Sequence, residues 1–171
     1  MKKKNTFIIL AILLVLAAAI VLLSWLNARQ GLGGEIGSLT ISRNGEILRV
    51  FTMDEIRAMP YIEQDQEIVS SSHQNERGVF RGVPLRALLE DADPELLQDA
   101  VTIVSRAEDA FVMAYSADEV LDSDDIFVAY SKDGNSLGTM EGGGSGPFRI
   151  IIIGDPFGNR STRFLIEIEV R

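Results

Sequence analysis

A glycine-rich loop followed by an arginine is the part of this sequence best suited to bind an anion. The run contains Gly142, Gly143, Gly144 and Gly146 and leads into Arg149. Backbone amides without side chains can form a concave anion site, and a guanidinium can bind an oxyanion through two parallel hydrogen bonds. The alternative is structural, with glycines that permit a tight turn and an arginine paired with a nearby acid such as Glu141 or Glu167. We take Gly143, Gly144, Gly146 and Arg149 as candidate cofactor-binding residues.

His73 is the only histidine and follows three serines, Ser70 to Ser72. Its imidazole titrates near neutral pH and could bind a ligand or move a proton, although a lone histidine without a partner at metal spacing is also an ordinary loop residue. We include His73 as a candidate cofactor-binding residue. The sequence has no cysteine, which removes thiolate metal sites, thiol nucleophiles and disulfides. We assign no catalytic residue and no metal ligand.

The N-terminal segment predicts a membrane anchor. Lys2, Lys3 and Lys4 precede an uncharged apolar stretch over residues 7–26, which is long enough as a helix to cross about 30 Å of hydrocarbon. The lysines favour a cytoplasmic N-terminus at residues 1–6. A cleaved signal peptide is the alternative, but its apolar core would be shorter and end in small residues. We therefore expect a single-pass protein of the cell membrane with a linker at 27–37 and an extracytoplasmic domain at 38–171.

The net charge of the chain restricts the classes of partner that it can bind. It has 25 acidic and 16 basic residues, and three of the basic ones are the N-terminal lysines. An acidic domain argues against nucleic acid. The expected partners are the membrane, through the N-terminal helix, a membrane protein and an anionic small molecule.

Turn and cap signals predict the first elements of the domain. Alternating apolar residues on both sides of Asn44-Gly45 indicate a β-hairpin over residues 38–51. Thr52 and Glu55 have the spacing of a capping box, which predicts a short helix ending before Pro60. Pro84 is suited to begin a second helix, with leucines of residues 85–89 on one face.

The later segments predict mostly strands. Residues 100–105 and 110–115 indicate a second hairpin, and residues 126–130 indicate a further strand. The apolar run 148–153 and the alternating run 164–170 are separated by turn residues, so we expect them to form a central hairpin whose second strand is half-exposed. The fold class is α+β, a mixed β-sheet domain with short helices.

Two motifs in this order resemble the oxidoreductase molybdopterin-binding domain, the cofactor domain of the sulfite oxidase family. They are Gly82-Val83-Pro84-Leu85 and Gly146-Pro147-Phe148-Arg149, within a similarity spanning residues 38–170. The resemblance implies the sulfite oxidase fold and a molybdopterin cofactor. In the family's enzymes a cysteine upstream of the first motif ligates molybdenum, whereas this chain has Val69-Ser70-Ser71-Ser72-His73 there.

Three functions follow from these observations. The missing thiolate favours a non-catalytic ligand-binding or interaction module on a membrane anchor. The resemblance itself implies a molybdopterin-dependent oxidoreductase or electron-transfer component. The third hypothesis is a structural subunit of a membrane complex, in which small residues of the anchor, such as Ala17 to Ala19, help helices to pack.

Overall fold

The computed structural model describes residue 16 and residues 37–69, 75–155 and 157–171. The chain divides into two compact units, residues 1–32 and 33–171, and every helix and strand named below belongs to the second. No helix in the described ranges is long and apolar enough to cross a membrane. The anchor predicted at residues 7–26 lies outside these ranges except for Leu16, so it stays a prediction.

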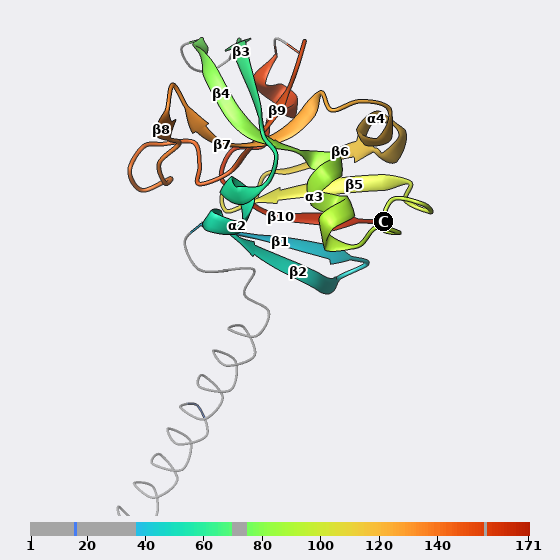
Figure 1. The fold of residues 1–171 in the computed structure, drawn as a ribbon. Coiled ribbons are helices and arrows are strands. Elements are labelled where there is room, and N and C mark those ends of the chain that lie inside the picture. The colour runs from blue at the N-terminus through green and yellow to red at the C-terminus, as the bar shows by residue number, and fades with distance from the viewer. Residues whose placement is uncertain (1–15, 17–36, 70–74, 156) are drawn as a thin grey trace, which may run out of the picture. The chain divides into compact units, whose positions relative to one another are not determined.

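The domain consists of two five-stranded sheets, which Figure 1 shows one above the other. Sheet A has the spatial order β2 (Glu46–Thr52), β1 (Ser38–Arg43), β10 (Leu165–Val170), β5 (Thr102–Ala107), β6 (Val112–Ser116). Sheet B has the order β3 (Ile62–Ile68), β4 (Glu76–Pro84), β7 (Ile126–Lys132), β8 (Asn135–Ser136), and β9 (Arg149–Ile152) also pairs with β7. The β1–β10 pair is parallel and the other pairs are antiparallel.

The helices are short and join the strands. They are α2 (Met53–Ala58), α3 (Leu85–Ala92), α4 (Ala117–Asp122) and the 3-10 helix η1 (Gly158–Arg160). The predicted class, a mixed β-sheet domain with short helices, is confirmed.

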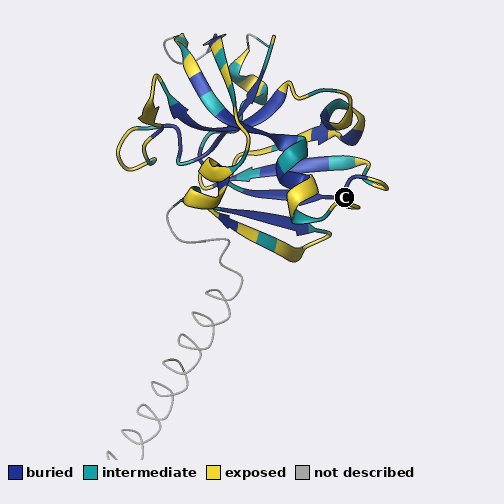
Figure 2. Cartoon of the chain, viewed as in Figure 1, coloured by how far each residue is buried: buried dark blue, intermediate teal, exposed yellow. Residues whose placement is uncertain are grey.

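The main core lies between the two sheets. Leu85, Leu88 and Leu89 of α3 are fully buried there, as their helical spacing predicts, against residues such as Ile41 of sheet A and Val128 of sheet B. A second apolar cluster contains Phe80 and Phe127, together with Ile68, Ala129, Leu137 and Ile151. Sheet B is therefore apolar on both faces, which explains why β7 is buried along nearly its whole length (Figure 2) and reads as a continuous apolar run.

The predicted first hairpin and its following helix are confirmed. Asn44 and Gly45 have φ values of 49° and 85°, the left-handed pair that a two-residue turn needs. The Thr52 amide donates to Glu55 Oε2 at 2.7 Å, and the Glu55 amide donates to Thr52 Oγ1 at 3.3 Å. This reciprocal capping box begins α2, which ends at Ala58 before Pro60.

The predicted central hairpin is wrong. Strand β9 pairs with β7 in sheet B, whereas β10 lies between β1 and β5 in sheet A. The intervening residues, including η1, carry the chain from one sheet to the other. The two segments are joined by the Leu165 amide, which donates to the Phe148 carbonyl oxygen at 2.9 Å, but their strands belong to different sheets. β10 is also not half-exposed: Glu167 and Glu169 are 5% and 6% exposed because both pair with Arg106.

Candidate functional site

The glycine loop uses its own backbone amides to hold its shape. Amides of residues 143–146 donate to carbonyls of residues 137–140, at distances of 3.0 Å for Gly143 to Met140, 2.9 Å for Gly144 to Thr139, 2.9 Å for Ser145 to Leu137 and 3.0 Å for Gly146 to Gly138. A Cβ atom on Gly144 would lie 2.3 Å from the Leu137 carbonyl oxygen, and one on Gly146 would lie 2.5 Å from Leu137 Cβ. These glycines allow close packing of the loop on itself, the structural role weighed above.

An open depression of about 650 Å³ lies beside this loop. Its wall combines the first residue of β4, the β7–β8 turn, the glycine loop and the segment before β10. We call it the Arg163 pocket, and its lining includes Glu76, Lys132, Asn135, Ser136, Gly143, Gly144 and Arg163. Two predicted site residues, Gly143 and Gly144, therefore line one polar pocket.

Arg163 is the lining residue with unused hydrogen-bonding capacity. Its terminal nitrogen donates to the Gly144 carbonyl oxygen at 3.0 Å. Its Nε is buried and has no hydrogen-bond partner among the described residues. A buried donor without a partner is costly, so the guanidinium of Arg163 has hydrogen-bonding capacity that the described residues do not use. In the sequence, Arg163 is simply one of two arginines, with Arg160, that follow the turn after residues 148–153.

Arg149 lies beneath the pocket and does not line it. Its side chain is 3% exposed. Its terminal nitrogen NH1 donates to Glu76 Oε2 at 2.6 Å and its Nε donates to Ser161 Oγ at 2.8 Å. Burial lowers the pKa of Arg149, and the bond and charge of Glu76 oppose that effect. The acid that pairs with it is thus Glu76, and not Glu141 or Glu167 as the sequence suggested.

Glu76 joins three strands through one carboxylate. Besides Arg149 on β9, it accepts from Lys132 Nζ of β7 at 3.1 Å. Burial raises the pKa of Glu76, but the hydrogen bonds and charges of Arg149 and Lys132 together outweigh burial and hold it below its ordinary value. Nothing in one sequence distinguishes this glutamate from the other acids, because the contact depends on the pairing of β4 and β9 with β7.

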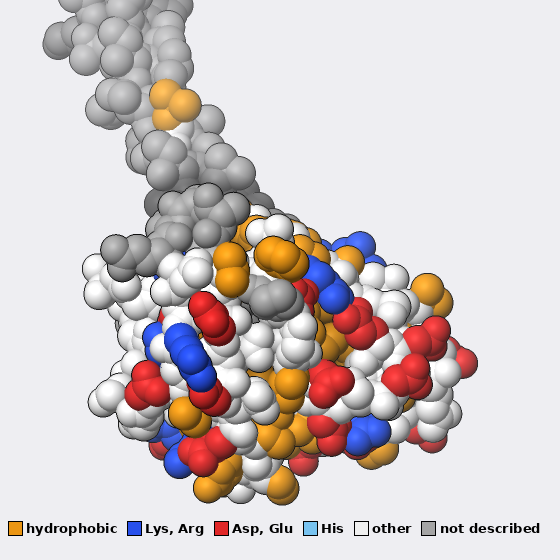
Figure 3. All heavy atoms as spheres, turned by 90° about the horizontal axis from the view of Figure 1, so that it is seen from above, with side chains coloured by type: hydrophobic (Ala, Val, Ile, Leu, Met, Phe, Trp, Pro, Cys, Tyr) orange, Lys and Arg blue, Asp and Glu red, His pale blue; other side chains and the backbone are white. Residues whose placement is uncertain are grey.

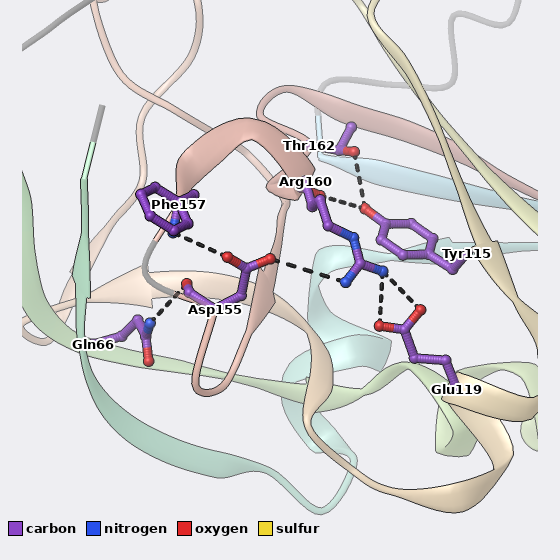
Figure 4. Close-up of polar contacts among 7 residues, drawn as sticks. All are labelled: Gln66, Tyr115, Glu119, Asp155, Phe157, Arg160 and Thr162. Atoms are coloured by element: carbon purple, nitrogen blue, oxygen red, sulfur yellow. Dashed lines mark hydrogen bonds and ion pairs between the residues drawn. The ribbon is translucent and has the colours of Figure 1, made fainter. Parts of the chain in front are cut away.

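A second polar network fixes the segment that carries Arg163 (Figure 4). Arg160 binds both carboxylate oxygens of Glu119 at 2.7 Å and lies 3.9 Å from Asp155. The Tyr115 hydroxyl donates to the Arg160 carbonyl oxygen at 2.7 Å. Burial raises the pKa of Tyr115, which keeps its proton on the donor. Arg160 is therefore committed to internal contacts, and residues 155–163 are tied to β6 and α4.

His73 lies outside the described residues, so its predicted role stays a prediction. Gly146 is described but does not line the pocket. Its amide donates to the Gly138 carbonyl oxygen, and its lack of a side chain allows the loop to pack closely against Leu137. The structure thus brings Gly143, Gly144 and Arg163 together, with Arg149 held just below them through Glu76.

Comparison with known proteins agrees with the predicted resemblance. Residues 38–171 match the family model described as the oxidoreductase molybdopterin binding domain. A search of curated proteins gave no match. Among solved structures, the sulfane dehydrogenase SoxCD from Paracoccus pantotrophus has a TM-score of 0.61 and 17% identity over 78% of this chain, and the matched region is 38% of that chain. At this identity the likeness shows a shared fold. The chain belongs to the oxidoreductase molybdopterin binding domain family.

Proposed function

We propose that this domain is a non-catalytic ligand-binding module, which uses the Arg163 pocket to hold a small anionic molecule. The observation that carries the proposal is the absence of cysteine from all 171 residues, and so from the whole family match at 38–171. The sulfite oxidase resemblance implies a thiolate ligand for molybdenum, and no residue of this chain can supply one.

Among the residues that the structure describes, no cluster of side chains replaces that thiolate. In the described ranges, no group of three or more His, Asp or Glu residues could hold a metal ion. Serine hydroxyls, as at Ser70 to Ser72, keep their protons at neutral pH, whereas a cysteine thiol loses its proton much more readily and so supplies the thiolate that binds a metal. The residues present therefore do not fit the metal half of a molybdopterin cofactor, and we derive no redox step.

The pocket does fit an anionic ligand. Arg163 lines the pocket and has a donor without a partner among the described residues, and a guanidinium binds phosphate or carboxylate oxygens strongly because its hydrogen bonds are charge-assisted. The volume of about 650 Å³ falls in the range of small-molecule sites. Gly143 and Gly144 contribute a wall without side chains beside the arginine.

The proposal includes a location. An uncharged stretch at residues 7–26, with three lysines before it, supports a single-pass anchor in the cell membrane with the domain at 38–171 outside the cytoplasm. Acidic and basic side chains are interspersed on the face of the domain in Figure 3, which favours a small ligand or a membrane-protein partner over nucleic acid there.

A second candidate is supported by the family match over residues 38–171. In it, the domain holds molybdopterin without a protein thiolate and serves an oxidoreductase or electron-transfer complex. The two candidates differ in metal content: the binding module contains no molybdenum, and the cofactor protein contains about one per chain.

The test uses the full chain purified in mild detergent from a host that makes molybdopterin. We expect metal analysis to find no stoichiometric molybdenum, and we expect orthophosphate or sulfate to raise the melting temperature, because a ligand that binds only the folded state stabilises it. Arg163→Gln should abolish the shift. Arg43→Gln, which removes the same charge from β1 in sheet A, is the matched control and should keep it. Stoichiometric molybdenum, or an anion shift that survives Arg163→Gln, would overturn the proposal.

A further inference from the structure

Glu76 is the acidic residue of the Arg163 pocket that pairs with two cations. Its carboxylate lines the pocket and lies 2.6 Å from Arg149 NH1 and 3.1 Å from Lys132 Nζ. These are the distances at which a phosphate or carboxylate of a ligand would contact the same two cations.

The charged side chains that line the pocket differ in the contacts that they already make within the protein. Lys132 is held by Glu76, and Asp133 accepts from the Val79 amide at 2.9 Å within the β7–β8 turn. Arg163 donates to the Gly144 carbonyl oxygen, lies over the Phe164 ring at 4.9 Å from its centroid and, among the described residues, forms no ion pair. The pocket thus offers one uncommitted cation, although three cations lie in or just beneath it.

The two partners of the buried pair differ in access to solvent. The side chain of Arg149 is 3% exposed, and that of Glu76 is 32% exposed. Arg149 is also fixed from behind, because its Nε donates to Ser161 Oγ, which in turn donates to the Ile150 carbonyl oxygen at 2.6 Å. The glutamate is therefore the more solvent-accessible member of the pair, and without its charge Arg149 and Lys132 would have no carboxylate partner among the described residues.

We propose that Glu76 is a built-in counter-anion that determines the specificity of the Arg163 pocket, restricting it to ligands with one anionic group. This inference rests on the proposed anion-binding function. While the Glu76 carboxylate is in place, it repels a second anionic group and already satisfies Arg149 and Lys132. Removing its charge leaves the positive charges of these two residues uncompensated beside Arg163, so the pocket attracts a ligand with two linked anionic groups.

The experiment measures binding of orthophosphate and of pyrophosphate to the full chain in detergent at neutral pH by calorimetry. Glu76→Gln keeps the shape of the side chain and removes its charge. We expect it to tighten pyrophosphate binding about tenfold, equivalent to about 1.4 kcal/mol, and to change orthophosphate binding less than threefold. Glu63→Gln is the matched control, since Glu63 pairs with the exposed Arg81 between β3 and β4 and is not among the residues that line the pocket. It makes the same change in net charge and should leave both affinities unchanged.

Two results would overturn the inference: Glu76→Gln that folds and binds pyrophosphate no better than wild type, or an equal gain in Glu63→Gln. If Glu76→Gln fails to fold, Glu76→Ser takes its place, because it also removes the negative charge and should likewise favour pyrophosphate. Failure of the proposed function looks different, since neither anion would then bind wild type or variants in a way that Arg163→Gln abolishes. Pyrophosphate binding that appears only in Glu76→Gln and is lost in Glu76→Gln with Arg163→Gln supports the inference.

Discussion

Glu76 and Arg149 form an ion pair at 2.6 Å although they are 73 residues apart and their strands do not pair with each other. Strand β7 lies between β4 and β9, and Lys132 at its end shares the same carboxylate. One side chain thus ties three strands together at the floor of the pocket.

This pair should matter for stability. Arg149→Met leaves the half-buried Glu76 with Lys132 alone and leaves Ser161 without its donor, so we expect a loss of about 3 kcal/mol, as for other broken buried pairs. Arg77→Met removes an exposed partner of Asp65 and should cost much less, because ion pairs in solvent contribute little to stability. Urea unfolding of the full chain in detergent, followed by circular dichroism, measures both. Equal losses would show that Arg149 behaves as a surface residue.

The stability of the domain at acidic pH should depend on the protonation of the Glu76 carboxylate. Because the folded-state pKa of Glu76 lies below the ordinary value of 4.5, its contribution is present above that value and is lost as pH falls through the lower, folded-state pKa. Glu76→Gln should therefore lose less stability than wild type on acidification below about pH 4.5. The pKa values of Glu55, Asp65 and Glu169 are also lowered, so the variant keeps a residual dependence. Melting curves from pH 7 to pH 3 give the comparison, and parallel wild-type and variant curves would contradict it.

The first hairpin should depend on its left-handed turn. Gly45 has a φ of 85°, where a β-branched residue is strained, and Gly45→Val should destabilise the domain by about 1–3 kcal/mol. Asn44→Gly also alters the turn but permits its φ of 49°, so it is the control and should change stability by less than about 1 kcal/mol. Thermal unfolding distinguishes the two, and an unchanged melting temperature in Gly45→Val would refute the turn assignment.

The Tyr115 hydroxyl should contribute to holding the segment that carries Arg163. Tyr115→Phe leaves the Arg160 carbonyl oxygen and the Thr162 hydroxyl without that partner, and we expect a loss of about 1–3 kcal/mol. The same change at Tyr61, which is 51% exposed, should have little effect. If the segment is positioned by this bond, anion binding to Tyr115→Phe should weaken as well, whereas a purely structural role would lower only the melting temperature.

The membrane anchor is tested by topology. We expect the mature protein to retain its N-terminal lysines, and we expect protease added outside intact cells to cleave in the glycine-rich linker at residues 27–37. A tag placed before Lys2 should stay protected, because the N-terminus is predicted to be cytoplasmic. A mature protein that begins near Ala28 would indicate a cleaved signal peptide instead.

Local signals predicted much of this fold, because they act within a few residues. The Asn44-Gly45 turn, the capping box at Thr52 and the helix after Pro84 all depend on neighbours in the chain, and all three are confirmed. The partner of a strand is different, since an apolar run followed by a turn does not encode which strand it meets. Residues 148–153 therefore seemed to pair with 164–170, while their partner is β7.

The candidate site was also predictable only in part. The loop containing Gly143 and Gly144 does line a pocket, and its glycine composition was the signal. The role of Glu76 was not readable, because it arises only when β4, β7 and β9 align in sheet B. Arg163 could be singled out only by the burial and missing partner of its Nε, which depend on three-dimensional packing.

The place of β10 in sheet A has a consequence for the order in which the domain forms. Strand β10 lies between β1 and β5, so it joins the first hairpin to the rest of the sheet. During synthesis, a chain made only as far as β9 already contains β1 and β5, the two strands that flank β10, but not β10 itself. Such a chain exposes two open strand edges, which promote aggregation. Sheet A can therefore form completely only after residues 165–170 have left the ribosome.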